Sequence, residues 1–244
     1  MNNIESRKAR WFRLFYEKIC GSEPNINILH RQYLAIYQLK PQLKEILQDF
    51  RGVCLDFGCG KQPYRTYMPN ISRYIGADIA PIEGVDLVIK DNVLPPTGEI
   101  DCVLSTQVLE HAQAAAIFAQ VFDRVKTGGG GRIAISVPFL YHAHGLPFDF
   151  RRFTKEGLSA WIESFGLKIE RVQTQGGIGS TITILFLSWL DANTTRGAIG
   201  KTIKLFGLPL FIPFTFCCNL IGIALDKLDH TESFYNNAIV VARK

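Results

Sequence analysis

The chain has 244 residues, of which 47% are hydrophobic, and its formal net charge is +5. This length holds one large domain or two small ones, and the hydrophobic content is that of a folded chain, not a disordered one. The charge alone is too weak to indicate a nucleic-acid partner. The six cysteines show neither a metal-ligand spacing nor a disulfide framework, which favours a reducing, cytoplasmic setting.

Residues 1–50 are predicted to form an N-terminal helical cap. Residues 5–20 mix basic and aromatic side chains in the pattern of an amphipathic helix. Residues 28–49 predict a second helix, in which Pro41 marks a break or a new first turn. The N-terminus shows no apolar core or small-residue cleavage site, so no signal peptide is expected.

From Val53 onward, short apolar runs alternate with helical segments. Strands are predicted at 53–57, 73–77, 85–89, 100–105, 131–137, 168–175 and 237–243. Helices are predicted at 112–126, before a run of glycines, and at 154–165, with Thr154 as N-cap. The alternation predicts an α/β fold with a mostly parallel sheet, covered on both faces. This core comprises residues 51–177 and 233–244, and residues 178–232 form an apolar helical insertion within it.

A glycine-bracketed turn follows the first predicted strand, in the run Val53–Gly60. Gly58 and Gly60 would let a ligand approach the backbone, and Asp78, after the next strand, could accept hydrogen bonds from ribose hydroxyls. The pattern therefore predicts a nucleoside site. A dinucleotide site prefers a third glycine where Pro63 stands, and no GKS or GKT follows, which disfavours a nicotinamide cofactor and excludes a P-loop.

Several segments, in order, resemble the motifs of class I S-adenosylmethionine-dependent methyltransferases, in the small-molecule, type 11-like branch. They are Asp56–Gly60, Asp78, Asp91–Pro95, Asp101–His111 with its Leu-Glu-His ending, and Val125–Pro138. The resemblance covers about residues 50–140. It implies a Rossmann-like, seven-stranded, mostly parallel sheet whose last strand is antiparallel.

The resemblance also implies S-adenosylmethionine as the cofactor. It places Asp78 on the ribose and Asp91 beside the adenine, although Asp91 also fits ordinary turn chemistry. Asp56 would anchor the loop or reach the amino group through water, and a helix N-terminus after the glycine turn would bind the methionine carboxylate. Cys59 is interpreted as a small loop filler. The predicted cofactor residues are Asp56, Gly58, Cys59, Gly60, Asp78, Ile79, Asp91, Asn92, Val93 and Thr106.

The predicted catalytic residues are His111, His142, His144 and Asp149. Three of the five histidines fall after the fourth and fifth predicted strands, whose carboxyl ends carry the ligand in this architecture. His144 or His142 is the first choice for a base that removes a hydroxyl proton. His111 could equally pack against the methionine end of the cofactor.

The histidine-containing loop leaves two further alternatives open. Asp149 could form a structural ion pair with Arg151 or Arg152. His142, His144 and Asp149 could bind a metal, but their spacing is not diagnostic, so no metal site is predicted. The loop also resembles one in bacterial methyltransferases encoded among surface-polysaccharide functions.

The insertion at 178–232 contains an uncharged run, Leu205–Leu225, that is long enough to cross a bilayer. Pro209 and Pro213 interrupt it, and a single crossing would separate the last strand from its sheet, so a transmembrane helix is not expected. Three interpretations remain open: a lid over the active site, a homodimer interface, or a hairpin that contacts the membrane surface.

The sequence thus predicts an S-adenosylmethionine-dependent methyltransferase acting, at oxygen, on a small-molecule, glycan or lipid-linked sugar acceptor. The alternatives are a non-catalytic scaffold that binds the cofactor and, less favoured, an NAD-dependent oxidoreductase. Nucleic acid is not expected as acceptor, because no motif for a flipped base follows the fourth strand. The expected location is cytoplasmic, with peripheral membrane contact as an option.

Overall fold

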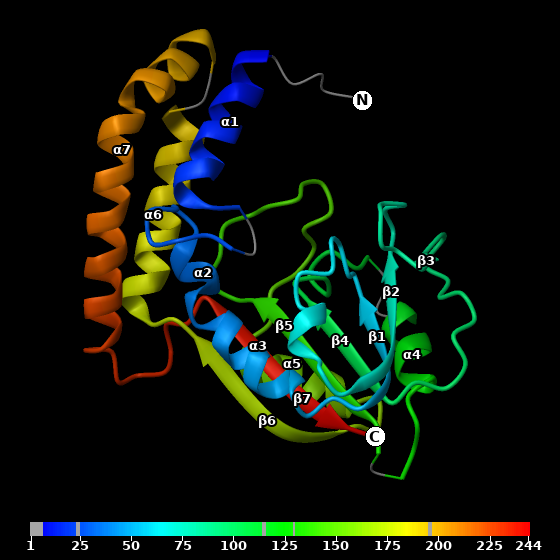
Figure 1. The fold of residues 1–244 in the computed structure, drawn as a ribbon. Coiled ribbons are helices and arrows are strands. Elements are labelled where there is room, and N and C mark those ends of the chain that lie inside the picture. The colour runs from blue at the N-terminus through cyan, green and yellow to red at the C-terminus, as the bar shows by residue number, and fades with distance from the viewer. Residues whose placement is uncertain (1–6, 23–24, 114–115, 129, 195–196) are drawn as a thin grey trace. The chain divides into compact units, whose positions relative to one another are not determined.

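The computed structural model describes residues 7–22, 25–113, 116–128, 130–194 and 197–244. Two compact units make up the chain. The sheet unit comprises Leu39–Gln175 and Tyr235–Lys244, and the helical unit comprises Met1–Gln38 and Gly176–Phe234. The chain thus leaves the sheet unit after Gln175, forms helices of the helical unit, and returns at Tyr235 to add the last strand of the sheet (Figure 1).

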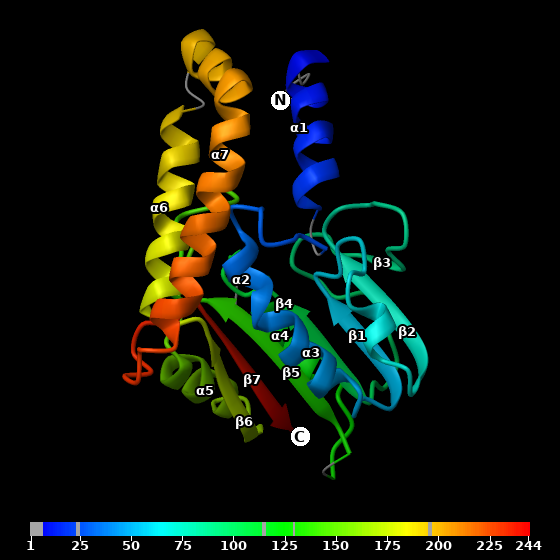
Figure 2. The ribbon, with the colours of Figure 1, turned by 60° about the vertical axis from the view of Figure 1, so that its left-hand side comes forward.

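A seven-stranded sheet forms the centre of the sheet unit (Figures 1 and 2). Its strands are β1 (Gly52–Phe57), β2 (Ile71–Asp78), β3 (Leu87–Val88), β4 (Cys102–Thr106), β5 (Arg132–Pro138), β6 (Lys168–Gln175) and β7 (Asn237–Arg243). The order is β3-β2-β1-β4-β5-β7-β6, and β7 runs antiparallel to both of its neighbours. The predicted fold class is confirmed, and every predicted strand is present with its bounds shifted by three residues or fewer.

Helices cover both faces of this sheet. They are α3 (Leu39–Leu47), the short 3-10 helix η1 (Arg65–Tyr67), α4 (Ala116–Asp123) and α5 (Lys155–Glu163). Successive residues of β1 alternate between the two faces: Leu55 and Phe57 pack with α4 and α5, whereas Cys54 packs with α3. This two-residue period is what a strand buried on both faces requires. The carboxyl ends of the parallel strands meet at one edge, where ligands bind in such sheets.

Three predicted helices differ in detail. Residues 28–49 form two helices, α2 (Tyr33–Tyr37) and α3, and Pro41 lies in the first turn of α3, where its missing N–H costs no hydrogen bond. The helix predicted at 112–126 spans only α4. No α-helix follows the glycine turn; Gln62 adopts a φ of 56° and Pro63 follows it, so the chain forms turns and η1 instead.

The helical unit contains α1 (Arg7–Cys20), α2, α6 (Ile178–Thr194) and α7 (Gly197–Asp226). Residues 5 and 6 of the first predicted helix lie outside the described residues. The expected interruption at Pro209 and Pro213 is wrong, since both prolines lie inside the continuous helix α7. A proline kinks a helix without ending it when the flanking turns keep their hydrogen bonds and packing, and here α7 packs along α6.

Candidate functional site

The glycine turn after β1 is tied to the neighbouring strand by backbone hydrogen bonds. Gly58 N and Cys59 N both donate to Ala77 O, at 2.7 and 3.1 Å. Gly58 has a φ of 78°, and a Cβ there would lie 2.2 Å from Val108, so only glycine fits. A Cβ on Gly60 would meet nothing within 4 Å, which leaves the space above that residue open to a ligand.

Asp78 ends β2 directly beside this open space. Its Oδ2 accepts from Gly60 N and its Oδ1 from Ala80 N, both at 2.9 Å. A carboxylate offers about four lone-pair sites, so each oxygen keeps capacity for one more donor. Asp78 can therefore hold the turn and still accept from a vicinal diol.

Asp56 is buried on β1, with 2% of its surface exposed. Its Oδ2 accepts from the hydroxyl of Tyr74 at 2.5 Å. Burial raises the pKa of Asp56 to about 7, with a further rise from Asp78 and a partial reduction by Tyr74. Burial likewise raises the pKa of Cys59 to about 12, which makes this thiol a poor nucleophile. Asp56 thus ties β1 to β2 through Tyr74, and its predicted part in cofactor binding stays a prediction.

The expected adenine segment is a tight turn. Asp91 and Asn92 have φ values of 53° and 57°, and Val93 N donates to Lys90 O at 2.9 Å. All three predicted contact residues, Asp91, Asn92 and Val93, are exposed. The conformation itself explains the Asp-Asn pair by turn chemistry. Among the other predicted cofactor residues, Ile79 is exposed immediately after Asp78, and Thr106 ends β4 at the same edge of the sheet.

A buried carboxylate and two imidazoles converge after β4. Glu110 is fully buried. Its Oε1 lies 3.7 Å from His111 Nε2 and 3.8 Å from His144 Nε2, and the two Nε2 atoms are 3.2 Å apart. Glu110 is the largest cause that raises the pKa of His144, and at 3.8 Å it acts as an ion-pair partner beyond hydrogen-bond reach. This cluster can attract a proton or a cation.

The loop after β5 brings His144 to this cluster through an ion pair. Arg152 binds both carboxylate oxygens of Asp149, at 2.5 and 2.7 Å, and holds the pKa of that carboxyl well below its usual range. Asp149 Oδ2 accepts in turn from His144 N at 2.9 Å. Asp149 is thus a positioning residue, and its partner is Arg152, because Arg151 donates to Gln113 O.

His142 belongs to the same loop but does not join the cluster. Its carbonyl accepts from Arg152 at 3.1 Å, and its ring stacks near Tyr141, with 4.4 Å between ring centroids. Glu110 was missed as a functional residue by sequence reasoning. The signal that could have found it is a carboxylate directly before His111 in the turn that follows β4.

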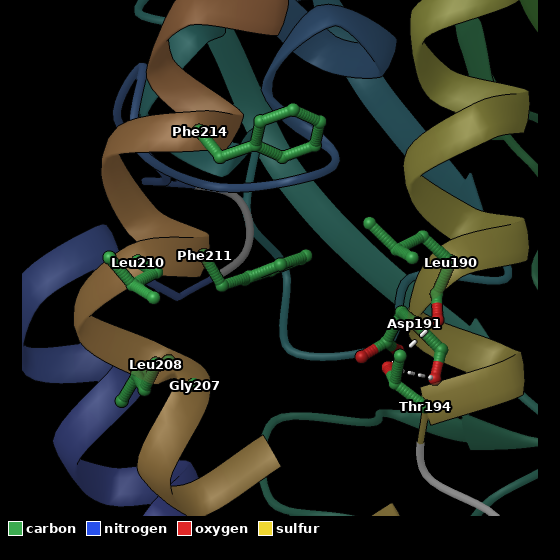
Figure 3. Close-up of a pocket in the computed structure, with 8 residues that line it drawn as sticks. All are labelled: Leu190, Asp191, Thr194, Gly207, Leu208, Leu210, Phe211 and Phe214. Atoms are coloured by element: carbon green, nitrogen blue, oxygen red, sulfur yellow. Dashed lines mark hydrogen bonds between the residues drawn. The ribbon is translucent and has the colours of Figure 1, made fainter. Parts of the chain in front are cut away.

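The helical unit carries a cavity of about 400 Å³ between α6 and α7 (Figure 3). Phe211 and Phe214 extend from α7 toward α6, and Leu190 extends from α6 toward α7. Among the described residues that line it, polar side chains occur at one end, at Asp191 and Thr194. The shape and lining suit an apolar chain that ends in a polar group.

Large apolar side chains remain exposed on both of these helices. On α6 they are Ile182, Leu185, Phe186 and Trp189, and on α7 they are Leu210, Phe214, Leu220, Ile221 and Leu225. Phe186 joins the two sets, since its ring lies 6.1 Å from that of Trp189 and 6.2 Å from that of Phe214. Among the described residues, one helical stretch, Gly207–Asp226, satisfies the length and composition needed to cross a membrane, and only 22% of it is buried.

No protein-family model and no curated protein sequence matches this chain. Solved structures do match. The (4+2)-cyclase SpnF is 19% identical over 85% of this chain and 80% of its own, with a TM-score of 0.53. A protein from Listeria monocytogenes, assigned as an S-adenosylmethionine-dependent methyltransferase, is 13% identical over 86% of this chain and 98% of its own, with a TM-score of 0.50.

A third match comes from a complex of the Haloferax volcanii Trm112 methyltransferase activator with a methyltransferase. It is 11% identical, covers 99% of both chains and has a TM-score of 0.50. This chain has the class I methyltransferase fold. At these identities the similarity concerns the fold, and the activity must be argued from the site.

Proposed function

We propose that this protein is an S-adenosylmethionine-dependent methyltransferase that acts at an oxygen of a small-molecule or glycan acceptor. One observation carries the proposal: Asp78 keeps acceptor capacity beside the open space above Gly60. A carboxylate in this position, at the carboxyl edge of such a sheet, suits the ribose of a nucleoside cofactor.

The cluster after β4 supports the choice of reaction. Methyl transfer to a hydroxyl is an in-line displacement at the sulfonium methyl, in which the protein aligns the reactants and helps to withdraw the hydroxyl proton. Glu110, His111 and His144 supply a negative charge and two ring nitrogens for that task. Glu110 and His111 follow β4 and His144 follows β5, so all three lie at the same edge of the sheet as the end of β2.

The alternative is a cofactor-binding protein with another activity or none. SpnF, which shares the fold, is named a cyclase, so the fold alone does not imply methyl transfer. An NAD-dependent oxidoreductase is less well supported, because Pro63 stands where the third glycine of a dinucleotide site is preferred.

Calorimetric titration with S-adenosylhomocysteine, S-adenosylmethionine and NAD tests the cofactor. We expect both adenosyl ligands to bind and NAD not to bind; binding of NAD alone would overturn the proposal. Mass spectrometry of cell-envelope glycans, with and without the gene, then tests the acceptor. A methyl group lost with the gene and restored by the wild-type protein, but not by Asp78→Asn, supports the glycan assignment.

We further propose that the helical unit contacts a membrane surface from the cytoplasmic side, which favours a lipid-linked acceptor. The exposed apolar residues of α6 and α7 form the contact face, joined by Phe186. The cavity between these helices could take part of a hydrocarbon chain, with its polar end near Asp191.

The charge pattern favours lipid over a second copy of the chain. In the sequence, the uncharged run Leu205–Leu225 is preceded by Arg196, Lys201 and Lys204 and followed by Lys227. Basic residues that flank an apolar run suit anionic headgroups, each adding about 1 kcal/mol near the surface.

Sedimentation with vesicles tests this contact. We expect binding to vesicles that contain phosphatidylglycerol, weaker binding at high salt, and loss of binding in Leu220→Glu/Ile221→Glu. Val172→Glu, which places one such charge on an exposed apolar position of β6, is the control and should still bind. Protein that stays in the supernatant with all vesicles refutes membrane contact, and a dimer that Leu220→Glu/Ile221→Glu dissociates would assign the face to self-association instead.

A further inference from the structure

Three potential ligand atoms converge at Glu110, His111 and His144. Glu110 Oε1 lies 3.7 Å from His111 Nε2 and 3.8 Å from His144 Nε2, and the two Nε2 atoms are 3.2 Å apart. The point equidistant from all three lies about 2.1 Å from each, which is the distance at which zinc binds imidazole nitrogen and carboxylate oxygen. The triangle therefore has the size of one face of a metal coordination sphere.

The hydrogen bond at the outer nitrogen of His111 leaves its inner nitrogen, Nε2, without a proton. His111 Nδ1 lies 2.8 Å from Phe148 O, and a carbonyl can only accept, so Nδ1 carries the proton. His144 Nδ1 lies 3.3 Å from His142 O and 3.5 Å from Asp149 Oδ2, which are acceptors, and 3.4 Å from the guanidinium of Arg152, which is a donor. The Nε2 lone pair of His111 therefore faces His144 Nε2 at 3.2 Å, where either a proton on His144 Nε2 or a cation between the two nitrogens would satisfy it.

The burial of Glu110 favours the cation over the proton. Its side chain is fully buried, and among the described residues neither carboxylate oxygen has a hydrogen-bond partner. A proton shared by the imidazoles would leave the carboxylate 3.7 Å away without a donor. A divalent cation at the centre would instead satisfy the carboxylate and both imidazoles at once.

We propose that Glu110, His111 and His144 bind a divalent transition-metal ion of the zinc type. Two imidazoles disfavour magnesium and calcium, which prefer oxygen ligands. Three protein ligands leave a fourth position for an exogenous oxygen, as in catalytic zinc sites. Phe148 O orients His111, and the Asp149–Arg152 ion pair orients His144, which is the outer support that such ligands require.

The role that we propose for the ion in catalysis rests on the proposed methyltransferase function. The acceptor hydroxyl would occupy the fourth position, where the cation lowers its pKa and its proton passes to water. The acceptor oxygen then forms the new O–C bond as the methyl group leaves the sulfonium sulfur. That sulfur keeps the electron pair of the broken bond and becomes a neutral thioether.

Metal titration of chelator-treated protein tests the site directly. We expect one equivalent of Zn²⁺ by calorimetry, and one equivalent of Co²⁺ to give the intense visible bands of four-coordinate cobalt. Loss of an orienting partner alone weakens metal binding about 10–100-fold, so Glu110→Gln and His144→Asn, which remove ligands, should each weaken it at least about 100-fold. His142→Asn, in the same loop but outside the cluster, is the control and should bind as tightly as the wild type.

Absence of both the Zn²⁺ equivalent and the Co²⁺ bands overturns the site, as does unchanged binding in folded Glu110→Gln and His144→Asn. Circular dichroism establishes that each variant is folded. Titration with S-adenosylhomocysteine before and after metal loading separates this inference from the proposed function. Metal binding without binding of S-adenosylhomocysteine would refute the methyltransferase and leave the metal site standing.

Discussion

Replacement of Asp56 by asparagine should stabilise the protein above neutral pH. The carboxyl is buried on β1 and accepts a hydrogen bond from Tyr74. Burial raises its pKa from 3.8 to about 7. Asparagine keeps the shape and can still accept from Tyr74, but it cannot ionise. The variant therefore removes the cost of a buried charge and retains the hydrogen bond.

The sign follows from proton linkage. The folded protein holds this proton more tightly than the unfolded chain, so its stability falls as pH rises from about 4 to about 7 and stays low above that. The raised pKa of Asp56 corresponds to a loss of folding stability of about 4 kcal/mol in total, of which about 3 kcal/mol is lost between pH 5 and pH 8. The buried amide donor of asparagine costs about 1–3 kcal/mol at every pH.

Urea unfolding of wild type and Asp56→Asn at several pH values measures the difference. We expect the stability of the variant, relative to wild type, to rise by about 3 kcal/mol from pH 5 to pH 8. Asp101→Asn is the control: Lys126 lowers the pKa of Asp101, so its contribution should be flat in this range. Parallel curves for wild type and Asp56→Asn would refute the reasoning.

Three further changes test other parts of the sheet unit. Asp78→Asn should weaken binding of S-adenosylhomocysteine about 10- to 150-fold, since a hydrogen bond to a charged group contributes about 1.5–3 kcal/mol. Asp86→Asn likewise removes the charge from a carboxylate that accepts from a backbone amide, that of Gly76, and should leave the affinity within about threefold. Thr154→Ala removes the N-cap bond to Gly157 and should cost about 1 kcal/mol in thermal unfolding, against no change for an exposed Ser-to-Ala control. Arg152→Gln should lower kcat about tenfold or more with little change in the affinity for S-adenosylhomocysteine; equal loss in both would assign Arg152 a general structural role.

Much of the sheet could be predicted from the sequence because its signals are local. A strand buried on both faces is a short apolar run, and such a run, as in β5 or β7, can be recognised from the local sequence alone. Thr154 was predicted as N-cap and does accept from Gly157 N at 2.9 Å. The helix expected after the glycine turn failed because a positive φ at Gln62 is set by contacts with the neighbouring segment at Gly84.

Part of the candidate site could likewise be predicted from the sequence, and part could not. Asp56, Gly58 and Asp78 were found from the sequence, because a turn between strand ends fixes their place at the edge of the sheet. Glu110 and its geometry were not found. The distance between His111 and His144, 33 residues apart, depends on how the loop after β5 folds back, and Arg152 fixes that through Asp149.

The sequence by itself therefore determined the fold class and the glycine turn at the edge of the sheet, since both follow from hydrophobic periodicity and the conformational needs of glycine. Only the tertiary structure decided which polar groups meet after β4. It also decided that the prolines of α7 lie within one helix and that the apolar faces of α6 and α7 stay exposed. The physical reason is that side-chain convergence and burial depend on contacts between residues distant in the chain, which local patterns do not encode.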